Sequence, residues 1–182
     1  GPPEYKGADR LIQDDKQVNA FALPGGKVAV YAGILPITRD ENGLAAVLGH
    51  EIGHVIARHG GERMSQQMGV SVVVETLASL SSGNPATVQA VSALLGAGAS
   101  VGVLLPWSRA QESEADHLGL ILMAKAGYDP HAARDLWVRM AELSAKGAGK
   151  PPEFLSTHPS EPTRIAQIQA WMPEAMQYYK PR

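Results

Sequence analysis

Cysteine is absent from the 182 residues of this sequence. The absence excludes disulfide bonds, cysteine nucleophiles and thiolate zinc sites, so any metal site in this chain must use histidines and carboxylates. An excess of positive charge is also absent, because 16 lysines and arginines face 18 acidic residues and no stripe rich in Lys or Arg occurs. That balance argues against a general nucleic-acid binder. Hydrophobic residues make up 45% of the chain, which indicates a folded protein rather than a disordered one.

The length and the apolar pattern predict one domain over residues 1–182, because the chain can bury a sizeable core and shows no internal repeat. Short strands are expected at 11–12, 18–23 and 27–35, with a turn at Pro24-Gly25-Gly26 and a stop at Pro36. Apolar residues at helical spacing predict helices over 41–59, 108–126, 130–146 and 162–171. Gly60-Gly61 is expected to end the first helix. The expected fold class is α+β, mainly α.

Two apolar segments, at 70–80 and 86–105, are further helix candidates. The second approaches the roughly 20 residues that a helix needs to span a bilayer. Its polar and small residues, among them Gln89, Ser92 and Ser100, weaken that interpretation. We expect a buried or partly exposed helix of a soluble protein, and membrane contact is the alternative.

One short motif carries chemistry: His50-Glu51-Ile52-Gly53-His54 fits the pattern H-E-x-x-H. On a helix, residues four apart lie about 40° from each other around the axis, so both imidazoles can bind one ion. Glu51 lies roughly 100° from His50, where its carboxylate can reach a metal-bound water. Zinc would lower the pKa of that water to about 7, and Glu51 could take its proton and deliver it to the leaving amine. A five-residue pattern can arise by chance, but this one lies in an amphipathic helix with capping residues at both ends.

A catalytic zinc usually has three protein ligands and one open position. Glu112 and Asp116 lie four residues apart on the predicted helix 108–126 and share a face, whereas Glu114 points elsewhere. We expect Glu112 to be the third ligand. Asp116 is expected to accept a hydrogen bond from the N–H of a ligand histidine, which would fix the tautomer of that ring. The alternative is a solvated acidic helix face.

Four segments together resemble zinc metallopeptidase family forty-eight. They are Asn19 to Gly26, Leu44 to His54, Ser108-Arg109 with Glu112 to Asp116, and Thr157-His158-Pro159 with Arg164. The resemblance implies a gluzincin-type domain with a small hairpin or sheet beside the zinc helix, and one Zn²⁺ per chain with Glu112 as a ligand. It favours the soluble branch, which has periplasmic BepA-like and mitochondrial-stress-protease-like members, over the membrane members of the HtpX-like and CAAX prenyl endopeptidase-like types.

The resemblance also implies how substrate and late residues act. Gluzincins hold an extended peptide as an added strand at a sheet edge. The segment expected to do so here is Val28, Ala29, Val30, Tyr31, Ala32 and Gly33, and an ordinary hairpin strand is the alternative. His158 could donate a hydrogen bond to the oxyanion of the tetrahedral intermediate, or it could bind zinc in the fourth position and hold the enzyme off. A surface histidine before Pro159 is the third interpretation, and Arg164 could orient this segment or pair with a nearby carboxylate.

These residues predict a zinc-dependent metalloendopeptidase. The resemblance implies that it hydrolyses unfolded or misassembled proteins in envelope quality control. The alternatives are a chaperone-like protein-binding module with low or self-inhibited proteolysis, and a membrane-embedded protease core. The expected location is periplasmic or otherwise extracytoplasmic, which allows membrane association or outer-membrane assembly partners. The expected partners are protein or peptide substrates and not nucleic acid.

Overall fold

The computed structural model describes residues 10–23, 27–62, 64–65, 68–69, 108–146, 152–159 and 162–182. The chain forms two compact units, one from Gly1–Ala57 with Trp107–Arg182 and the other from Arg58–Pro106. All strands named below belong to the first unit. The expected helices at 70–80 and 86–105 lie outside the described residues. Within the described ranges, no helix combines the length and the apolar character that a membrane span requires.

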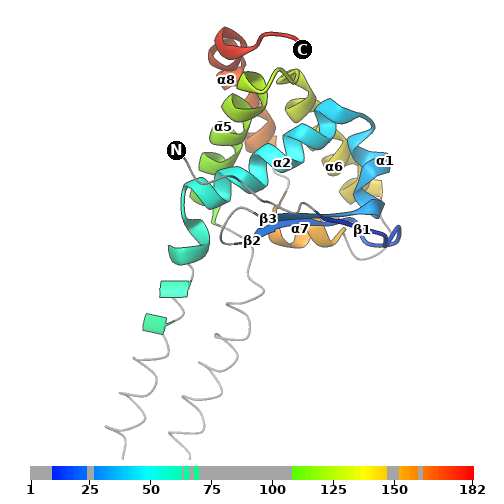
Figure 1. The fold of residues 1–182 in the computed structure, drawn as a ribbon. Coiled ribbons are helices and arrows are strands. Elements are labelled where there is room, and N and C mark those ends of the chain that lie inside the picture. The colour runs from blue at the N-terminus through cyan, green and yellow to red at the C-terminus, as the bar shows by residue number, and fades with distance from the viewer. Residues whose placement is uncertain are drawn as a thin grey trace, which may run out of the picture. The chain divides into compact units, whose positions relative to one another are not determined.

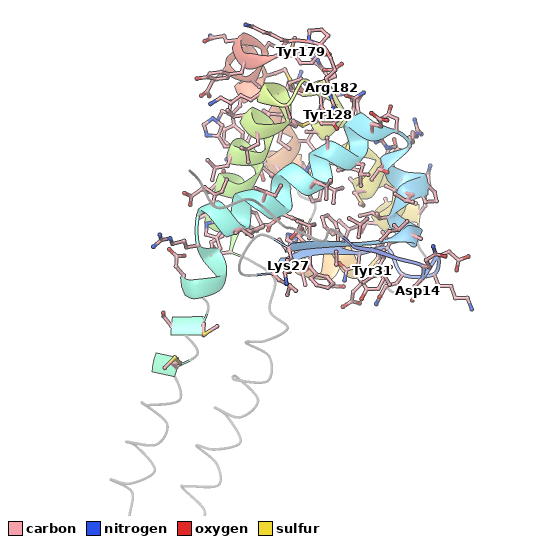
Figure 2. All side chains as sticks on the ribbon, in the orientation of Figure 1. Asp14, Lys27, Tyr31, Tyr128, Tyr179 and Arg182 are labelled. Atoms are coloured by element: carbon pink, nitrogen blue, oxygen red, sulfur yellow. The ribbon has the colours of Figure 1, made fainter. Side chains whose placement is uncertain are left out.

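Three short strands form one sheet, over which helix α2 lies (Figure 1). The strands are β1 (Arg10–Ile12), β2 (Ala20–Leu23) and β3 (Lys27–Tyr31). β3 pairs in parallel with β1 and antiparallel with β2. Val28 and Val30 of β3 are buried in the core, whereas Lys27 and Tyr31 lie on the face turned away from α2 (Figure 2). The small sheet beside the zinc helix is therefore confirmed.

The strand expected over residues 27–35 ends earlier, at Tyr31. Ala32–Ile34 form a 3-10 turn (η1), and Leu35–Thr38 form the short helix α1 with Pro36 in its first turn. A Cβ on Gly33 would lie 2.5 Å from the carbonyl oxygen of Gln17, so only glycine allows the two backbones to approach so closely. The chain bends at this contact, which the β-branched pattern of the segment did not indicate.

The edge position expected for Val28–Gly33 is wrong, because β3 is the central strand. Ala29 and Val30 have β1 on one side and β2 on the other, and Ala32 and Gly33 lie beyond the strand. The strand with a free edge toward α2 is β2. The Ala22 N–H of β2 does not donate to β3 but to Glu51 Oε2, at 3.2 Å.

Helix α2 (Glu41–Ile56) begins at Asp40, whose side chain accepts a hydrogen bond from the N–H of Gly43 at 2.9 Å. It was expected to continue to His59 and to end at Gly60-Gly61. It ends three residues earlier, because Arg58 adopts the left-handed conformation with φ of 58°. Gly60 and Gly61 themselves are helical, in a separate short segment that belongs to the second unit.

Four further helices of the first unit lie in the described residues. They are α5 (Arg109–Lys125), α6 (His131–Lys146), α7 (Glu153–Thr157) and α8 (Pro162–Tyr178). Ser108 caps α5 in a capping box with Gln111, which confirms the predicted start. α8 runs past the expected end at Trp171, because Met172 and Ala175 still face the core, and it includes Pro173. The short helix α7 was not expected.

The core lies between the sheet and the helices, with α5 packed alongside α2 (Figure 1). The largest fully buried apolar side chains come from six elements: Ile34, Val47, Leu120, Leu136, Met140, Phe154 and Ile168. The mainly helical fold with a small sheet agrees with the predicted gluzincin-type class. This core fixes α2 against both α5 and β2, which positions the motif residues.

Candidate metal centre

Helix α2 carries the H-E-x-x-H motif through the interior of the first unit. His50 and His54 lie one turn apart, and their Nε2 atoms are 3.1 Å from each other. Both side chains are buried, with exposed fractions of 2% and 5%. The helical spacing therefore directs two imidazole nitrogens to a common point, as the motif predicts.

Small residues let α5 approach α2 closely. A Cβ on Gly53 would lie 2.6 Å from the carbonyl oxygen of Ala115, and a Cβ on Gly49 would lie 2.8 Å from that of Gly119. Neither position has room for a larger residue unless a helix backbone moves. Glycine inside a helix costs about 1 kcal/mol relative to alanine. The close approach explains why Gly53 is nevertheless present, and it sets the distance from α2 to Glu112.

Helix α5 contributes both of the acidic side chains that were singled out from the sequence. Glu112 Oε1 lies 3.0 Å from His54 Nε2, and Asp116 Oδ1 lies 2.8 Å from His50 Nδ1. Both carboxylates are buried, whereas Glu114 is exposed. The alternative of a solvated acidic face is therefore wrong for these two residues. Because Nδ1 of His50 donates its proton to Asp116, Nε2 is the nitrogen of this ring that would bind a metal.

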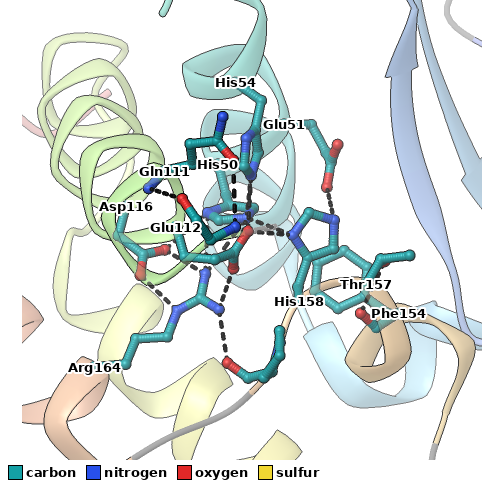
Figure 3. A network of polar contacts seen from close by, with 12 residues as sticks. His50, Glu51, His54, Gln111, Glu112, Asp116, Phe154, Thr157, His158 and Arg164 are labelled. Carbon is teal, nitrogen blue, oxygen red and sulfur yellow. Dashed lines mark hydrogen bonds and ion pairs between the residues drawn. The ribbon is translucent and has the colours of Figure 1, made fainter. Parts of the chain in front are cut away.

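His158 and Arg164 enter the same cluster from the end of α7 and the first turn of α8 (Figure 3). His158 Nδ1 lies 2.8 Å from Glu112 Oε1 and 3.0 Å from His50 Nε2. Arg164 donates from Nε and Nη2 to the two oxygens of Asp116, at 2.5 and 2.7 Å, and its Nη1 lies 2.5 Å from Glu112 Oε2. The interpretation of His158 as a surface residue is wrong, since its exposed fraction is 3%.

The donor set fits a zinc ion. One ligand atom each from His50, His54, Glu112 and His158 lies within 4.8 Å of the others, and the closest pairs are 2.8 to 3.1 Å apart. Bonds of about 2.0–2.1 Å in a tetrahedral zinc site place neighbouring donor atoms about 3.3 Å apart. Nitrogen and carboxylate donors that converge in a buried place at nearly this spacing are typical of a zinc site.

The charges around His50 also favour a cation. Burial by itself lowers the pKa of His50, but Glu112 and Asp116 outweigh burial and raise that pKa to about 9. Burial lowers the pKa of His54 to about 3, although Glu112 opposes the shift. His54 therefore stays neutral, with a lone pair available to a metal.

The two carboxylates remain ionised despite their burial. Burial alone would raise the pKa of both groups. The charge of His50 and the hydrogen bond from His158 hold the pKa of Glu112 below its usual range. Arg164 and His50 do the same for Asp116. A centre with two fixed carboxylates is suited to hold a divalent cation.

Glu51 lies beside the donor atoms and on the opposite side of them from Arg164 (Figure 3). Its Oε2 accepts the hydrogen bond from Ala22, and His158 Nε2 lies 3.3 Å from its Oε1. No described residue makes a hydrogen bond to this buried Oε1. Burial raises the pKa of Glu51, while the charges of His158 and His50 oppose the shift. A carboxylate with a raised pKa and an oxygen without a hydrogen bond has the properties of a general base.

The structure adds groups at the centre that the sequence did not reveal. The ring of Trp137 lies 5.7 Å from that of His50 and 3.4 Å beneath the guanidinium of Arg164. Phe154 stacks on Trp137, with ring centroids 5.8 Å apart. No motif in the sequence marks Trp137, and α7 is too short to give a periodic signal. The Ala22 contact depends on strand pairing, which no local motif encodes.

A buried H-E-x-x-H helix that faces a glutamate on a second helix defines a metallopeptidase of the gluzincin type. The family description "Peptidase family M48" matches residues 4–172 of this sequence. The chain therefore belongs to peptidase family M48, and its buried cluster of three histidines and one glutamate is a candidate metal site of the kind typical of the zinc peptidases of this family.

Curated relatives agree with this family. The chain is 46% identical over 161 residues to "Mitochondrial metalloendopeptidase OMA1" of Schizosaccharomyces pombe, covering 88% of this chain and 45% of that protein. It is 36% identical over 173 residues to the protein of the same name from Arabidopsis thaliana, covering 93% and 33%. It is 32% identical over 160 residues to "Beta-barrel assembly-enhancing protease" of Escherichia coli, covering 86% and 32%. The chain thus spans less than half the length of these relatives.

Proposed function

We propose that the protein containing this chain hydrolyses internal peptide bonds of unfolded or misassembled proteins, as a protease of protein quality control. The observation that carries the proposal is the position of Glu51. One of its oxygens lies at the cluster of potential metal donors, and the other accepts a hydrogen bond from the edge strand β2. A single carboxylate thereby joins the place of catalysis to the place where a peptide strand can lie.

His50 and His54 would hold zinc through their Nε2 atoms, and Glu112 through a carboxylate oxygen. Bound zinc supplies the Lewis acidity that makes water a nucleophile near neutral pH and polarises a peptide carbonyl. Glu51 accepts the proton of the attacking water and passes it to the leaving amine. Asp116 keeps the proton of His50 on Nδ1, and Arg164 holds Asp116 in place.

The substrate would lie as an added strand along β2 rather than along β3. β2 has its free edge on the side of Glu51, as the outward N–H of Ala22 shows. Main-chain hydrogen bonds to such an edge give affinity with little dependence on sequence. Extended, unfolded segments can form these bonds, whereas folded domains cannot, and this restriction supports the proposed substrate class.

His158 supports a second form of the same function, in which the protease restrains itself. Its Nδ1 lies within 3.0 Å of both His50 Nε2 and Glu112 Oε1, among the donors rather than at a distance from them. A ligand there would occupy the position that water needs. In this form the protein binds unfolded chains and cleaves slowly until the segment after α7 moves.

Support for a compartment and for partners comes from the relatives alone. Two of those relatives are named as mitochondrial and a third as enhancing β-barrel assembly. We therefore propose an organellar or extracytoplasmic location, with membrane proteins and their assembly factors among the partners. Fractionation of the source cells tests this location, and a cytosolic protein would contradict it.

Cleavage of casein, an unfolded protein, tests the catalytic proposal. Wild-type chain loaded with zinc should cleave it. Glu51→Gln should lose about 10²-fold to 10⁴-fold in rate, because it cannot accept a proton. Both chains should hold equal zinc. Equal cleavage by the two chains would refute the assigned base, and absence of cleavage by wild type would refute the activity.

The role of His158 is tested separately by His158→Ala. If His158 occupies the fourth ligand position, the substitution should raise casein turnover severalfold and leave one zinc per chain. Lower turnover with unchanged zinc would assign the residue to the oxyanion instead. Unchanged kinetics would remove His158 from the site.

A further inference from the structure

A cavity of about 140 Å³ lies beside the metal centre, between the N-terminal turns of α5 and α8. Its volume is close to that of cavities that hold one benzene molecule, so it can accept a single amino-acid side chain. The residues at its mouth are exposed, so it opens to solvent. The polar and charged residues that line it are Arg109, Glu112, Ser113, Thr163, Arg164 and Gln167.

The cavity shares a wall with the metal centre. Glu112 directs Oε1 to His54 and His158, at 3.0 and 2.8 Å, and also lines the cavity. Arg164, on the opposite side of the donor atoms from Glu51, lines it as well (Figure 3). A side chain in the cavity would therefore be separated from the donor atoms only by the carboxylate of Glu112.

The cavity is lined by hydrogen-bonding groups. Arg164 and Glu112 form an ion pair with each other, at 2.5 Å, and Arg164 also binds Asp116. Nearer the mouth, the Ser113 hydroxyl donates to the Gln167 amide oxygen at 3.3 Å. The single hydroxyl proton of Ser113 is donated to Gln167, whereas the amide of Gln167 and the guanidinium of Arg109 carry N–H donors. Such a lining suits a guest that offers a carbonyl oxygen.

We propose that this cavity is a substrate subsite that selects carboxamide or carboxylate side chains, those of Asn, Gln, Asp and Glu, over aliphatic side chains of similar size. The proposal rests on the proposed function, since it concerns the peptide that the metal centre would cleave. It adds a preference at one substrate position to the sequence-tolerant binding along β2. The amide N–H of Gln167 would donate to the carbonyl oxygen of the substrate side chain, Ser113 would orient that amide through its hydrogen bond to Oε1, and Arg109 would favour the carboxylates.

Cleavage profiling of a positional-scanning peptide library tests the preference. Wild type should favour Gln and Glu over Leu at one position by about threefold to tenfold, the effect of one hydrogen bond. Gln167→Leu should remove that preference at the same position only. Gln169→Leu, an exposed substitution on the same helix, is the matched control and should leave the profile unchanged. Arg109→Gln should lower the preference for Glu relative to Gln, because Arg109 is the residue proposed to favour a carboxylate over a carboxamide.

A binding measurement decides the inference independently of turnover. Zinc-loaded Glu51→Gln would be titrated with fluorescein-labelled octapeptides that carry Gln, Glu or Leu at each position in turn. The Gln and Glu peptides should bind about threefold to tenfold tighter than Leu at one position, and the added substitution Gln167→Leu should abolish the difference. Equal binding of the three peptides at every position, or a preference that survives Gln167→Leu, overturns the subsite. Loss of cleavage by wild type with the binding preference intact would instead overturn the proposed function alone.

Discussion

At the metal centre, neighbouring residues fix which nitrogen of His50 carries a proton and which can bind a metal. His50 can present Nε2 to a metal only because Nδ1 donates to Asp116, and Asp116 is itself held by two donors of Arg164. Trp137 supports this arrangement from below, with its ring 3.4 Å from the guanidinium carbon of Arg164. Arg164 of α8 thus holds Asp116 of α5, and Asp116 holds His50 of α2. Zinc affinity should therefore depend on Arg164 and Asp116, although neither would touch the ion.

Asp116→Asn tests this dependence. The amide keeps the shape of the side chain but removes the charge that raises the pKa of His50 and pairs with Arg164. The zinc dissociation constant should rise about 10-fold to 100-fold, which a competition titration with a chromophoric chelator measures. Asp129→Asn is the control, because Asp129 forms a similar pair with His131 at the surface, at 2.7 Å. Equal zinc affinity of the two variants would contradict the positioning role of Asp116.

Helices α2 and α5 form the centre because their backbones approach closely at glycine. Gly53 faces the carbonyl oxygen of Ala115, three residues from Glu112 on α5. A methyl group at position 53 must therefore move α5, and with it the third potential ligand. The close packing of these two helices is thus what places Glu112 at the metal centre.

Gly53→Ala should lower both stability and zinc affinity. Overpacking of a helix contact costs about 1–3 kcal/mol, which outweighs the gain in helix propensity of about 1 kcal/mol. The thermal midpoint of the zinc-free chain should therefore fall. Gly60→Ala is the control, since a Cβ at position 60 meets no atom within 4 Å. A Gly53→Ala chain with unchanged stability and zinc affinity would show that the close approach is not required.

Local patterns predicted the long elements well and the connections poorly. The capping box at Ser108 and the stop at Lys146 were predictable, because caps and periodicity are encoded within a few residues. The end of α2 at Arg58 was not, since a left-handed arginine carries no sequence signal. The central position of β3 was missed because β1 pairs with β3 rather than with β2, the strand that follows it in sequence.

The candidate site was predicted in the same uneven way. His50, Glu51 and His54 follow from one motif, and the spacing of Glu112 and Asp116 indicated their shared face. The structure brings all five together with His158 and Arg164, two residues for which the sequence left several roles open. The β2 edge and the cavity beside Glu112 were missed, because each is built from segments whose proximity arises only in the folded chain.

Across the first unit as a whole, the buried centre should couple metal binding to folding. Elements α2, α5, α7 and α8 all supply groups to one cluster, so an ion there would hold four segments together. A ligand present at about 1,000 times its dissociation constant stabilises the folded state by about 4 kcal/mol. We therefore expect the first unit to be markedly less stable without metal.

The zinc content of the purified chain tests the central claim most directly. Wild type would be loaded with zinc, dialysed and analysed by inductively coupled plasma mass spectrometry, beside Glu112→Gln and His54→Ala. We predict one zinc per wild-type chain and well under one for either variant, with folding verified by circular dichroism. A wild-type chain that retains no zinc, or variants that retain as much as wild type, would contradict the assignment of this cluster as the metal centre.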